Sequence, residues 1–211
     1  MKKGILFDLD GTLWDSSQTV IDSWNECLAL KTDLNRTYTV EQMKSYMGKT
    51  LDKIGDMMMP DLPPSERLRI MHLLADYERV YLKSHGSNYF RNEEAVIRGL
   101  AAEYFLGIVS NCQDGYIQIF IEQCGFGECF SDFECSSTGL DKAGNIGLVA
   151  QRNSLDRIIY VGDTVLDGEA ARKAGVPFVH AGYGFGSPDD FDLRISSIEE
   201  LPAAAKQLLQ N

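Results

Sequence analysis

The chain has 211 residues, a length typical of one ordinary domain that carries an insertion. It contains 20 basic and 31 acidic residues, and its formal charge of −11 argues against a general electrostatic attraction to nucleic acid or to an anionic membrane. An anionic substrate would therefore need a local cationic site or a bound metal.

The cysteine pattern bears on the cellular compartment. Five cysteines with no CxxC pair, and only three histidines, predict reduced thiols in a cytoplasmic protein, with neither a disulfide framework nor a zinc site. The first apolar run ends at residue 8, too early for a signal peptide, and no apolar stretch reaches membrane-spanning length. We therefore expect no membrane association, and the oligomeric state stays open.

The first predicted element is a short buried strand, residues 5–7, that ends in two acids. Asp8 and Asp10 are two residues apart, so an extended backbone would point both the same way, roughly 6–7 Å apart. Gly11 then allows a sharp turn. The two carboxylates repel each other unless a cation or a shared proton intervenes. An Asp-Gly pair alone would equally suit a plain turn, so residues further along the chain must decide.

Residues 16–83 lack an obvious buried strand and predict several helices. One helix face is predicted from the spacing of Ile70, Leu73, Leu74, Tyr77, Val80 and Tyr81. Residues 57–64 combine three methionines with prolines, which predicts a loop whose methionines fill gaps in a core. We interpret 16–83 as a small helical module inserted into a unit formed by 1–15 and 84–211.

From residue 92 onward, short apolar strands alternate with helices. Strands are predicted at 105–109, weakly at 130–135, at 157–161 and at 177–180, and helices at about 92–103, 114–123, 142–152, 166–174 and 198–209. Asn92 is predicted to cap the first of these helices. The alternation predicts an α/β fold, a Rossmann-like, doubly wound parallel sheet with helices on both faces.

Polar residues follow the apolar runs of three predicted strands: Asp8 and Asp10, Ser110 and Asn111, and Asp163. Lys142 opens a predicted helix nearby in sequence. Ligands of such sheets bind beyond the carboxyl ends of the strands. A candidate nucleophile, hydrogen-bond donors, a cation and a further acid suit phosphoryl transfer, in which positioning and charge stabilisation dominate.

Four stretches in this order carry a resemblance to a known family: 8–13, 109–111, Lys142 and 161–167. They resemble the four motifs of the haloacid dehalogenase-like phosphohydrolases, particularly the phosphoglycolate phosphatase and beta-phosphoglucomutase branch. The block 16–83 is similar to the family's α-helical cap. Lys142 is followed by Ala-Gly-Asn instead of the prolines usual in this branch, so its loop is expected to differ.

The resemblance implies catalytic roles for three residues. Asp8 would attack phosphorus and form an aspartyl phosphate, Asp10 would act as general acid and then general base, and Lys142 would balance charge. Mg²⁺ would be held by the Asp8 carboxylate, the Asp10 backbone carbonyl and Asp163. The turn at 11–15 would be a hinge that lets the cap close.

The resemblance also implies phosphate-binding and specificity residues. The phosphate-binding set is Ser110, Asn111, Lys142, Gly11 and Thr12. Lys49, in a Met-Gly-Lys-Thr loop, is a candidate specificity residue or else a surface lysine after a helix-ending glycine. Asp167 either orients Asp163 or a metal-bound water, or forms a capping box with Thr164. Cys112 reads as a small buried residue with no histidine nearby in sequence to activate it.

The sequence therefore predicts a Mg²⁺-dependent phosphatase of small phosphate monoesters that acts on a phosphorylated metabolite. Phosphoglycolate, a sugar phosphate and a nucleotide monophosphate all stay open as substrates. The alternatives are a phosphosugar mutase of the same fold and a non-enzymatic phosphate-binding regulatory protein. The acid at position 10 argues against a dehalogenase of this type.

Overall fold

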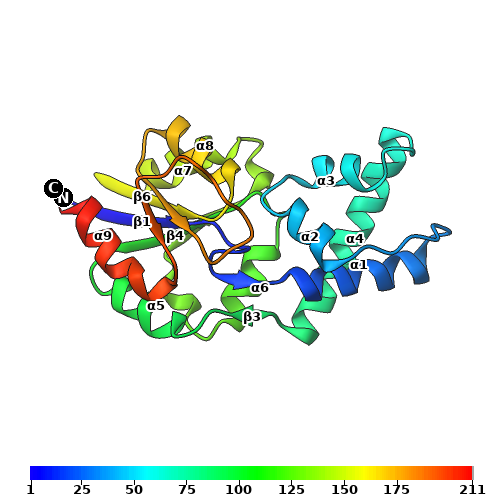
Figure 1. Ribbon diagram of the computed structural model, residues 1–211, viewed down its shortest axis with the longest axis horizontal. Coiled ribbons are helices and arrows are strands. Elements are labelled where there is room, and N and C mark those ends of the chain that lie inside the picture. Colours follow the sequence, from blue (N-terminus) through cyan, green and yellow to red (C-terminus); the bar gives the residue numbers. More distant parts are fainter. Residues whose placement is uncertain (211) are drawn as a thin grey trace.

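The computed structural model describes residues 1–210, and its central feature is one parallel sheet (Figure 1). Its strands are β1 (Lys3–Phe7), β4 (Phe105–Val109), β5 (Asp132–Glu134), β6 (Arg157–Gly162), β7 (Phe178–Ala181) and β8 (Leu193–Ile195). The strand order is β5-β4-β1-β6-β7-β8, with every neighbouring pair parallel. The predicted parallel α/β fold is confirmed, and β8 is a strand that the sequence did not reveal.

Helices cover both faces of this sheet, as a doubly wound fold requires. Figure 1 shows α7 (Lys142–Arg152) and α8 (Val165–Ala174) on one face, and α5 (Glu93–Ala101) and α9 (Leu201–Leu209) on the other. The alternation of side chains along β1 divides the core accordingly. Ile5 and Phe7 enter the larger apolar cluster, whereas Leu6 enters the cluster formed with α7 and α8.

The inserted helices lie beside the sheet, at the end toward which its strands run (Figure 1). They are α1 (Ser17–Lys31), α2 (Val40–Tyr46), α3 (Leu51–Met58) and α4 (Pro64–His85). The predicted boundary at residue 83 falls inside α4, which continues for two more residues. The two segments that join this block to the sheet, β2 (Trp14–Asp15) and β3 (Asn88–Tyr89), pair with each other as antiparallel strands.

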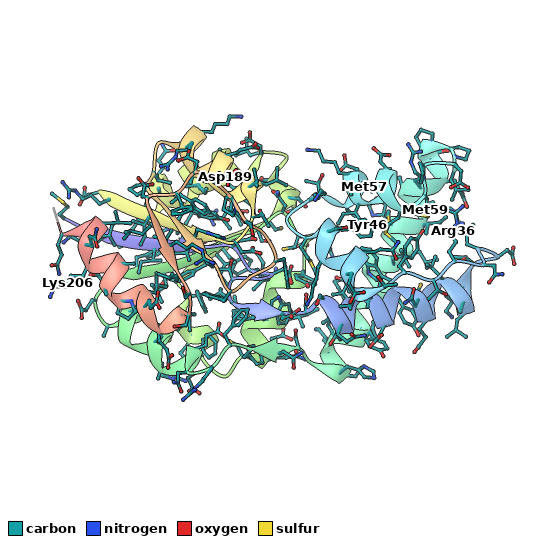
Figure 2. All side chains as sticks on the ribbon, in the orientation of Figure 1. Arg36, Tyr46, Met57, Met59, Asp189 and Lys206 are labelled. Atoms are coloured by element: carbon teal, nitrogen blue, oxygen red, sulfur yellow. The ribbon has the colours of Figure 1, made fainter. Side chains whose placement is uncertain are left out.

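The buried face of α4 differs from the predicted one. Val80 is 73% exposed, and the buried positions are Ile70, Met71, Leu74, Ala75, Glu78 and Leu82. The buried face therefore contains an acid, Glu78, where the apolar pattern gave no sign of one. The methionines behave largely as expected: Met59 is fully buried among these helices, whereas Met57 is 47% exposed (Figure 2).

Smaller elements correct two further predictions. Asn92 stands at the start of α5 in the left-handed conformation, and its side chain bonds Glu199 instead of capping the helix. The predicted C-terminal helix begins as a short 3₁₀ turn, Ile198–Glu200, before α9. The other 3₁₀ turns and the remaining helix are Gly127–Cys129, Ser136–Thr138 and α6 (Tyr116–Gln123).

Two structural findings bear on compartment and membrane. All five cysteines carry free thiols. Of the helices within residues 1–210, none combines the length and the apolar character that crossing a bilayer demands.

Glu93 is buried at the start of α5, and its titration should be visible in stability. The Phe90 amide donates to Glu93 Oε2 at 3.0 Å, and Oε1 is buried without a partner among residues 1–210. Burial raises the pKa of Glu93 to about 8, whereas the ordinary value is 4.5. The folded state therefore keeps a proton that the unfolded state loses, so the free energy of unfolding falls as the pH rises from about 4.5 to 8.

Glu93→Gln should weaken this pH dependence. Relative to the wild type, we expect the variant to gain roughly 3 kcal/mol between pH 5 and pH 8, measured by urea unfolding. Glu94→Gln is the control, because Glu94 is adjacent but exposed and paired with Arg98. Parallel pH profiles for the wild type and Glu93→Gln would show that Glu93 titrates normally.

Candidate active site

Asp8, directly after β1, is joined to a buried lysine. Lys142 Nζ donates to Asp8 Oδ1 at 3.0 Å and to Asp167 Oδ1 at 2.6 Å, and all three side chains are at most 4% exposed. Lys142 is the first residue of α7, whose N-cap Asp141 accepts a hydrogen bond from the Gly144 amide at 2.8 Å. The helix start therefore fixes the backbone from which the lysine reaches the acids.

Sheet register brings the third acid to the same place. β1 and β6 are adjacent parallel strands with Phe7 opposite Val161, and the Asp8 amide donates to the Val161 carbonyl at 2.8 Å. Asp8 and Asp163 therefore leave the sheet side by side. Carboxylate oxygens of Asp8, Asp163 and Asp167 all lie within 4.8 Å of one another, and all three residues are buried.

The charges of this cluster do not balance. Three acids face one lysine, which leaves two uncompensated negative charges if all are ionised. Burial, followed by the charge of Asp167, raises the pKa of Asp8 to about 7 and that of Asp163 well above its ordinary value. Burial alone would lower the pKa of Lys142, but the Asp167 and Asp8 carboxylates outweigh it and raise that pKa. A divalent cation would restore neutrality.

The free oxygens show which acids could hold such a cation. Asp163 Oδ2 accepts the Phe185 amide at 2.7 Å, but Asp163 Oδ1 is buried with no partner among the described residues. An unpaired buried carboxylate oxygen is costly unless something binds it. The oxygen-only donor set suits Mg²⁺, so the residues present fit the predicted metal.

Unlike Asp163, Asp167 accepts hydrogen bonds at both of its carboxylate oxygens. Its Oδ1 accepts from Lys142, and its Oδ2 accepts from the Thr164 amide at 2.9 Å and the Thr164 hydroxyl at 2.6 Å. The predicted capping box at the start of α8 is present. Asp167 thereby orients Lys142, a contact that the sequence did not suggest.

Asp10 lies apart from the lysine cluster. Its Oδ1 accepts hydrogen bonds from Trp14 Nε1 at 2.8 Å, Ser16 Oγ at 2.5 Å and Tyr116 OH at 2.9 Å. Burial raises the pKa of Asp10 above its ordinary value, although these three donors oppose the shift. A carboxyl group with a raised pKa and a fixed orientation can deliver a proton near neutral pH.

A cavity of about 50 Å³ lies between the sheet's carboxyl end and the inserted helices. Asp8, Asp10, Ser110 and Asn111 line it from the sheet side, and Trp24, Lys49 and Glu78 are among its lining residues from the helices. A volume of this size holds a few water molecules.

The inserted helices contact the sheet residues directly at this cavity. Asn111 Nδ2 donates to the Gly48 carbonyl at 2.8 Å. Next to it, Lys49 lines the cavity while its Nζ donates to the Ser45 carbonyl at 2.7 Å. The loop that carries the predicted specificity residue is therefore held against the predicted phosphate-binding residue.

Gly11 and Thr12 are placed differently from the other predicted phosphate-binding residues. Gly11 has φ +78°, and a Cβ there would lie 2.4 Å from Asp163 Oδ2, so only glycine lets the turn approach this acid. Thr12 is buried, and its carbonyl accepts from Tyr183 OH at 2.9 Å. The described lining of the cavity includes neither residue.

Several residues of the site were not anticipated. Tyr116 and Gln113 come from the segment after β4, where no sequence pattern singled them out. Glu78 could have been noticed, because it lies one helical turn beyond the buried Leu74 and thus on the same face. Cys112 also lines the cavity, and burial raises the pKa of its thiol well above the ordinary value, which argues against a reactive thiolate.

The parallel sheet, the buried acid–lysine cluster and the inserted helices define an α/β enzyme with a carboxylate centre. The sequence profile of the haloacid dehalogenase-like hydrolases matches residues 5–181. The chain therefore belongs to this family, as its four motifs predicted.

Individual known proteins resemble this chain in sequence or in fold. A phosphoglycolate phosphatase of Shigella dysenteriae is 26% identical and aligns with 90% of this chain and 85% of its own length. A haloacid dehalogenase-like family hydrolase from Streptococcus pneumoniae has a similar structure, with a TM-score of 0.82, 21% identity, and coverage of 97% of this chain and 98% of its own. A predicted phosphoglycolate phosphatase from Haemophilus somnus gives a TM-score of 0.82 at 21% identity, covering 96% and 97%.

Proposed function

We propose that the protein is a Mg²⁺-dependent phosphatase that hydrolyses small phosphate monoesters through an aspartyl phosphate on Asp8. The observation that carries the proposal is the buried cluster of Asp8, Asp163, Asp167 and Lys142 beside a cavity that Asp8 also lines. Membership of a hydrolase family and the relatives called phosphoglycolate phosphatases support it.

Asp8 is the proposed nucleophile. Its Oδ1 is held by Lys142, and it lines the cavity, where an ester phosphorus can approach its carboxylate. Attack forms a bond from an Asp8 oxygen to phosphorus and breaks the bond from phosphorus to the leaving oxygen. Mg²⁺, held by Asp8 and Asp163 with the Asp10 carbonyl, would neutralise the acids and the phosphoryl oxygens.

Asp10 is the proposed general acid and base. It protonates the leaving oxygen, and it then takes a proton from the water that cleaves the aspartyl phosphate. Its hydrogen bonds from Trp14, Ser16 and Tyr116 all reach Oδ1. Oδ2 is therefore the oxygen left to carry the transferred proton.

Ser110, Asn111 and Lys142 are the proposed phosphate-binding groups. Ser110 and Asn111 follow β4, which neighbours β1 in the sheet, so their donors face the same cavity as Asp8. Fixed donors that meet the developing negative charge lower the barrier without reorganising during the reaction. Lys142 contributes a positive charge directly beside Asp8.

We propose that helices α1–α4 act as a cap that closes over the substrate. The paired connecting strands β2 and β3 are the expected hinge, since the chain crosses between the two parts only there. Closure excludes water and limits the substrate to a small molecule. A phosphorylated protein side chain could not be enclosed in this way.

Metal dependence gives the direct test. Purified protein with Mg²⁺ should release phosphate from p-nitrophenyl phosphate and from small metabolite esters, and chelation with excess EDTA should lower turnover at least roughly 10³-fold. Added Mg²⁺ should also raise the melting temperature at pH 7.5, because the ion binds only the folded acid cluster. Asp163→Asn should remove most of both effects.

The rival functions give different results in the same assays. A mutase would convert a hexose 1-phosphate into its isomer without releasing phosphate. A binding protein would show the shift in melting temperature without turnover on any ester of a broad panel, and that result would refute the proposal.

A further inference from the structure

Glu78 is a buried acid in the cavity that the proposed reaction does not use. It lies on α4, it is 2% exposed, and it lines the same cavity as Asp8 and Asp10. Its neighbours along the buried face of the helix are apolar, among them Leu74 and Leu82. An apolar side chain would therefore suit packing at this position better than an acid does.

The partners of Glu78 hold it in place without neutralising it. Trp24 Nε1 donates to Oε2 at 2.5 Å, and Gln113 Nε2 donates to Oε1 at 2.8 Å. No ion pair within residues 1–210 involves Glu78, and the adjacent Arg79 bonds Asp76 and the Asp114 carbonyl. Consistent with this isolation, burial raises the pKa of Glu78 to about 8.

The two hydrogen bonds leave part of the carboxyl group available. Each oxygen of the ionised carboxylate can accept two hydrogen bonds, and each receives only one from residues 1–210. Trp24 and Gln113 come from opposite walls of the cavity, one from α1 and the other from the segment after β4. Glu78 is thus fixed from both sides, with acceptor capacity left for a third group.

We propose that Glu78 selects phosphate esters whose leaving group carries a hydrogen-bond donor, a hydroxyl or an ammonium group, and disfavours those whose leaving group carries a carboxylate. This inference rests on the proposed function, because it takes the phosphate to lie at Asp8 and the leaving group to extend into the rest of the cavity. A donor would use the free acceptor capacity of Glu78, whereas above pH 8, where the Glu78 carboxyl is ionised, a substrate carboxylate would meet a like charge.

Three esters with two-carbon leaving groups test the proposal when they are assayed above pH 8, where Glu78 is ionised: 2-hydroxyethyl phosphate, 2-aminoethyl phosphate and 2-phosphoglycolate. In the wild-type protein, at least one of the two donor esters should exceed phosphoglycolate in kcat/KM by about 10-fold or more. Glu78→Gln removes the negative charge and keeps the shape, so it should reduce this ratio at least about five-fold, mainly by accelerating phosphoglycolate.

Two further variants make the result interpretable. Glu66→Gln is the matched control, since it is the same substitution on the exposed side of the same helix, about 18 Å away along its axis. It should leave the ratio unchanged. Glu78→Leu matches the apolar neighbours and should fold and lose the preference even if the glutamine is poorly tolerated.

The outcomes separate the two proposals. Either order between the hydroxyl and ammonium esters supports the inference, provided that both the preference and its loss are seen. A wild type that hydrolyses phosphoglycolate best, or a ratio that neither Glu78 variant changes, overturns the inference and leaves the phosphatase proposal standing. No turnover of these esters or of p-nitrophenyl phosphate would overturn both.

Discussion

Asp8→Asn is expected to abolish phosphate release, lowering kcat by at least roughly 10⁴-fold on every ester that the wild type hydrolyses. The reason is chemical, because an amide oxygen cannot form the proposed acyl phosphate. The asparagine can still accept the hydrogen bond from Lys142, so the site should otherwise keep its shape. Steady-state phosphate release with excess Mg²⁺ measures the effect.

The same substitution should not destabilise the protein. Burial raises the folded-state pKa of Asp8 to about 7, so above that pH its ionised form lowers stability when no metal is bound. The metal-free variant should therefore match or exceed the wild type in melting temperature at pH 8. Lost activity with retained stability would separate a chemical role from a structural one.

A matched substitution at the other end of the sheet gives the control. Asp156 stands just before β6 and accepts the Lys2 amide at 2.6 Å. Asp156→Asn should change stability slightly and leave turnover intact, since the site lies at the opposite ends of these strands. If Asp8→Asn keeps a tenth or more of the wild-type rate, Asp8 is not the nucleophile.

Lys142→Met is expected to damage both stability and catalysis. The substitution leaves the buried carboxylates of Asp8 and Asp167 without the lysine that bridges them. Such a loss typically lowers the free energy of unfolding by about 3–5 kcal/mol. It also removes the positive charge that faces the phosphoryl group, so kcat should fall at least roughly 10²-fold. Urea unfolding and steady-state turnover measure the two effects.

The stability loss should depend on pH in a definite direction. Without the lysine, which lowers the pKa of Asp8, this acid takes up a proton in the folded state at a pH where the unfolded state has lost it. The deficit relative to the wild type should therefore be largest at pH 8 and shrink toward pH 5. A deficit that grows as the pH falls would contradict this account of the cluster.

Two variants test whether charge balance is the cause. The double variant Lys142→Met with Asp167→Asn removes one stranded charge, so it should recover part of the stability but not the turnover. Lys173→Met, on the other hand, removes an exposed lysine that pairs with Asp141, and it should change stability by no more than about 0.5 kcal/mol.

The parallel α/β core and the acids at its strand ends could be predicted from the amino-acid pattern alone. Buried strands of a parallel sheet have a distinctive apolar run, and the acids that interrupt these runs stand out because so few polar residues occur there. Asp8 and Asp163 could be named in this way, whereas Lys142 was named from its place at the start of a predicted helix and from the family resemblance. Their proximity in space could also be predicted, because the carboxyl ends of adjacent parallel strands lie at one edge of a sheet.

The residues that face this cluster from the inserted helices became known from the folded structure. The buried face of α4 could not be chosen from apolar spacing, because Val80 is exposed and Glu78 is buried against Trp24 and Gln113. Likewise, Asp167 accepts hydrogen bonds both from Thr164, the N-cap of its own helix, and from Lys142. Lys142 is distant in sequence, so no local sequence pattern predicts this contact. The spacing of apolar residues indicates which face of a helix or strand is buried. The hydrogen-bond partner of a single polar residue depends instead on which other element packs against it.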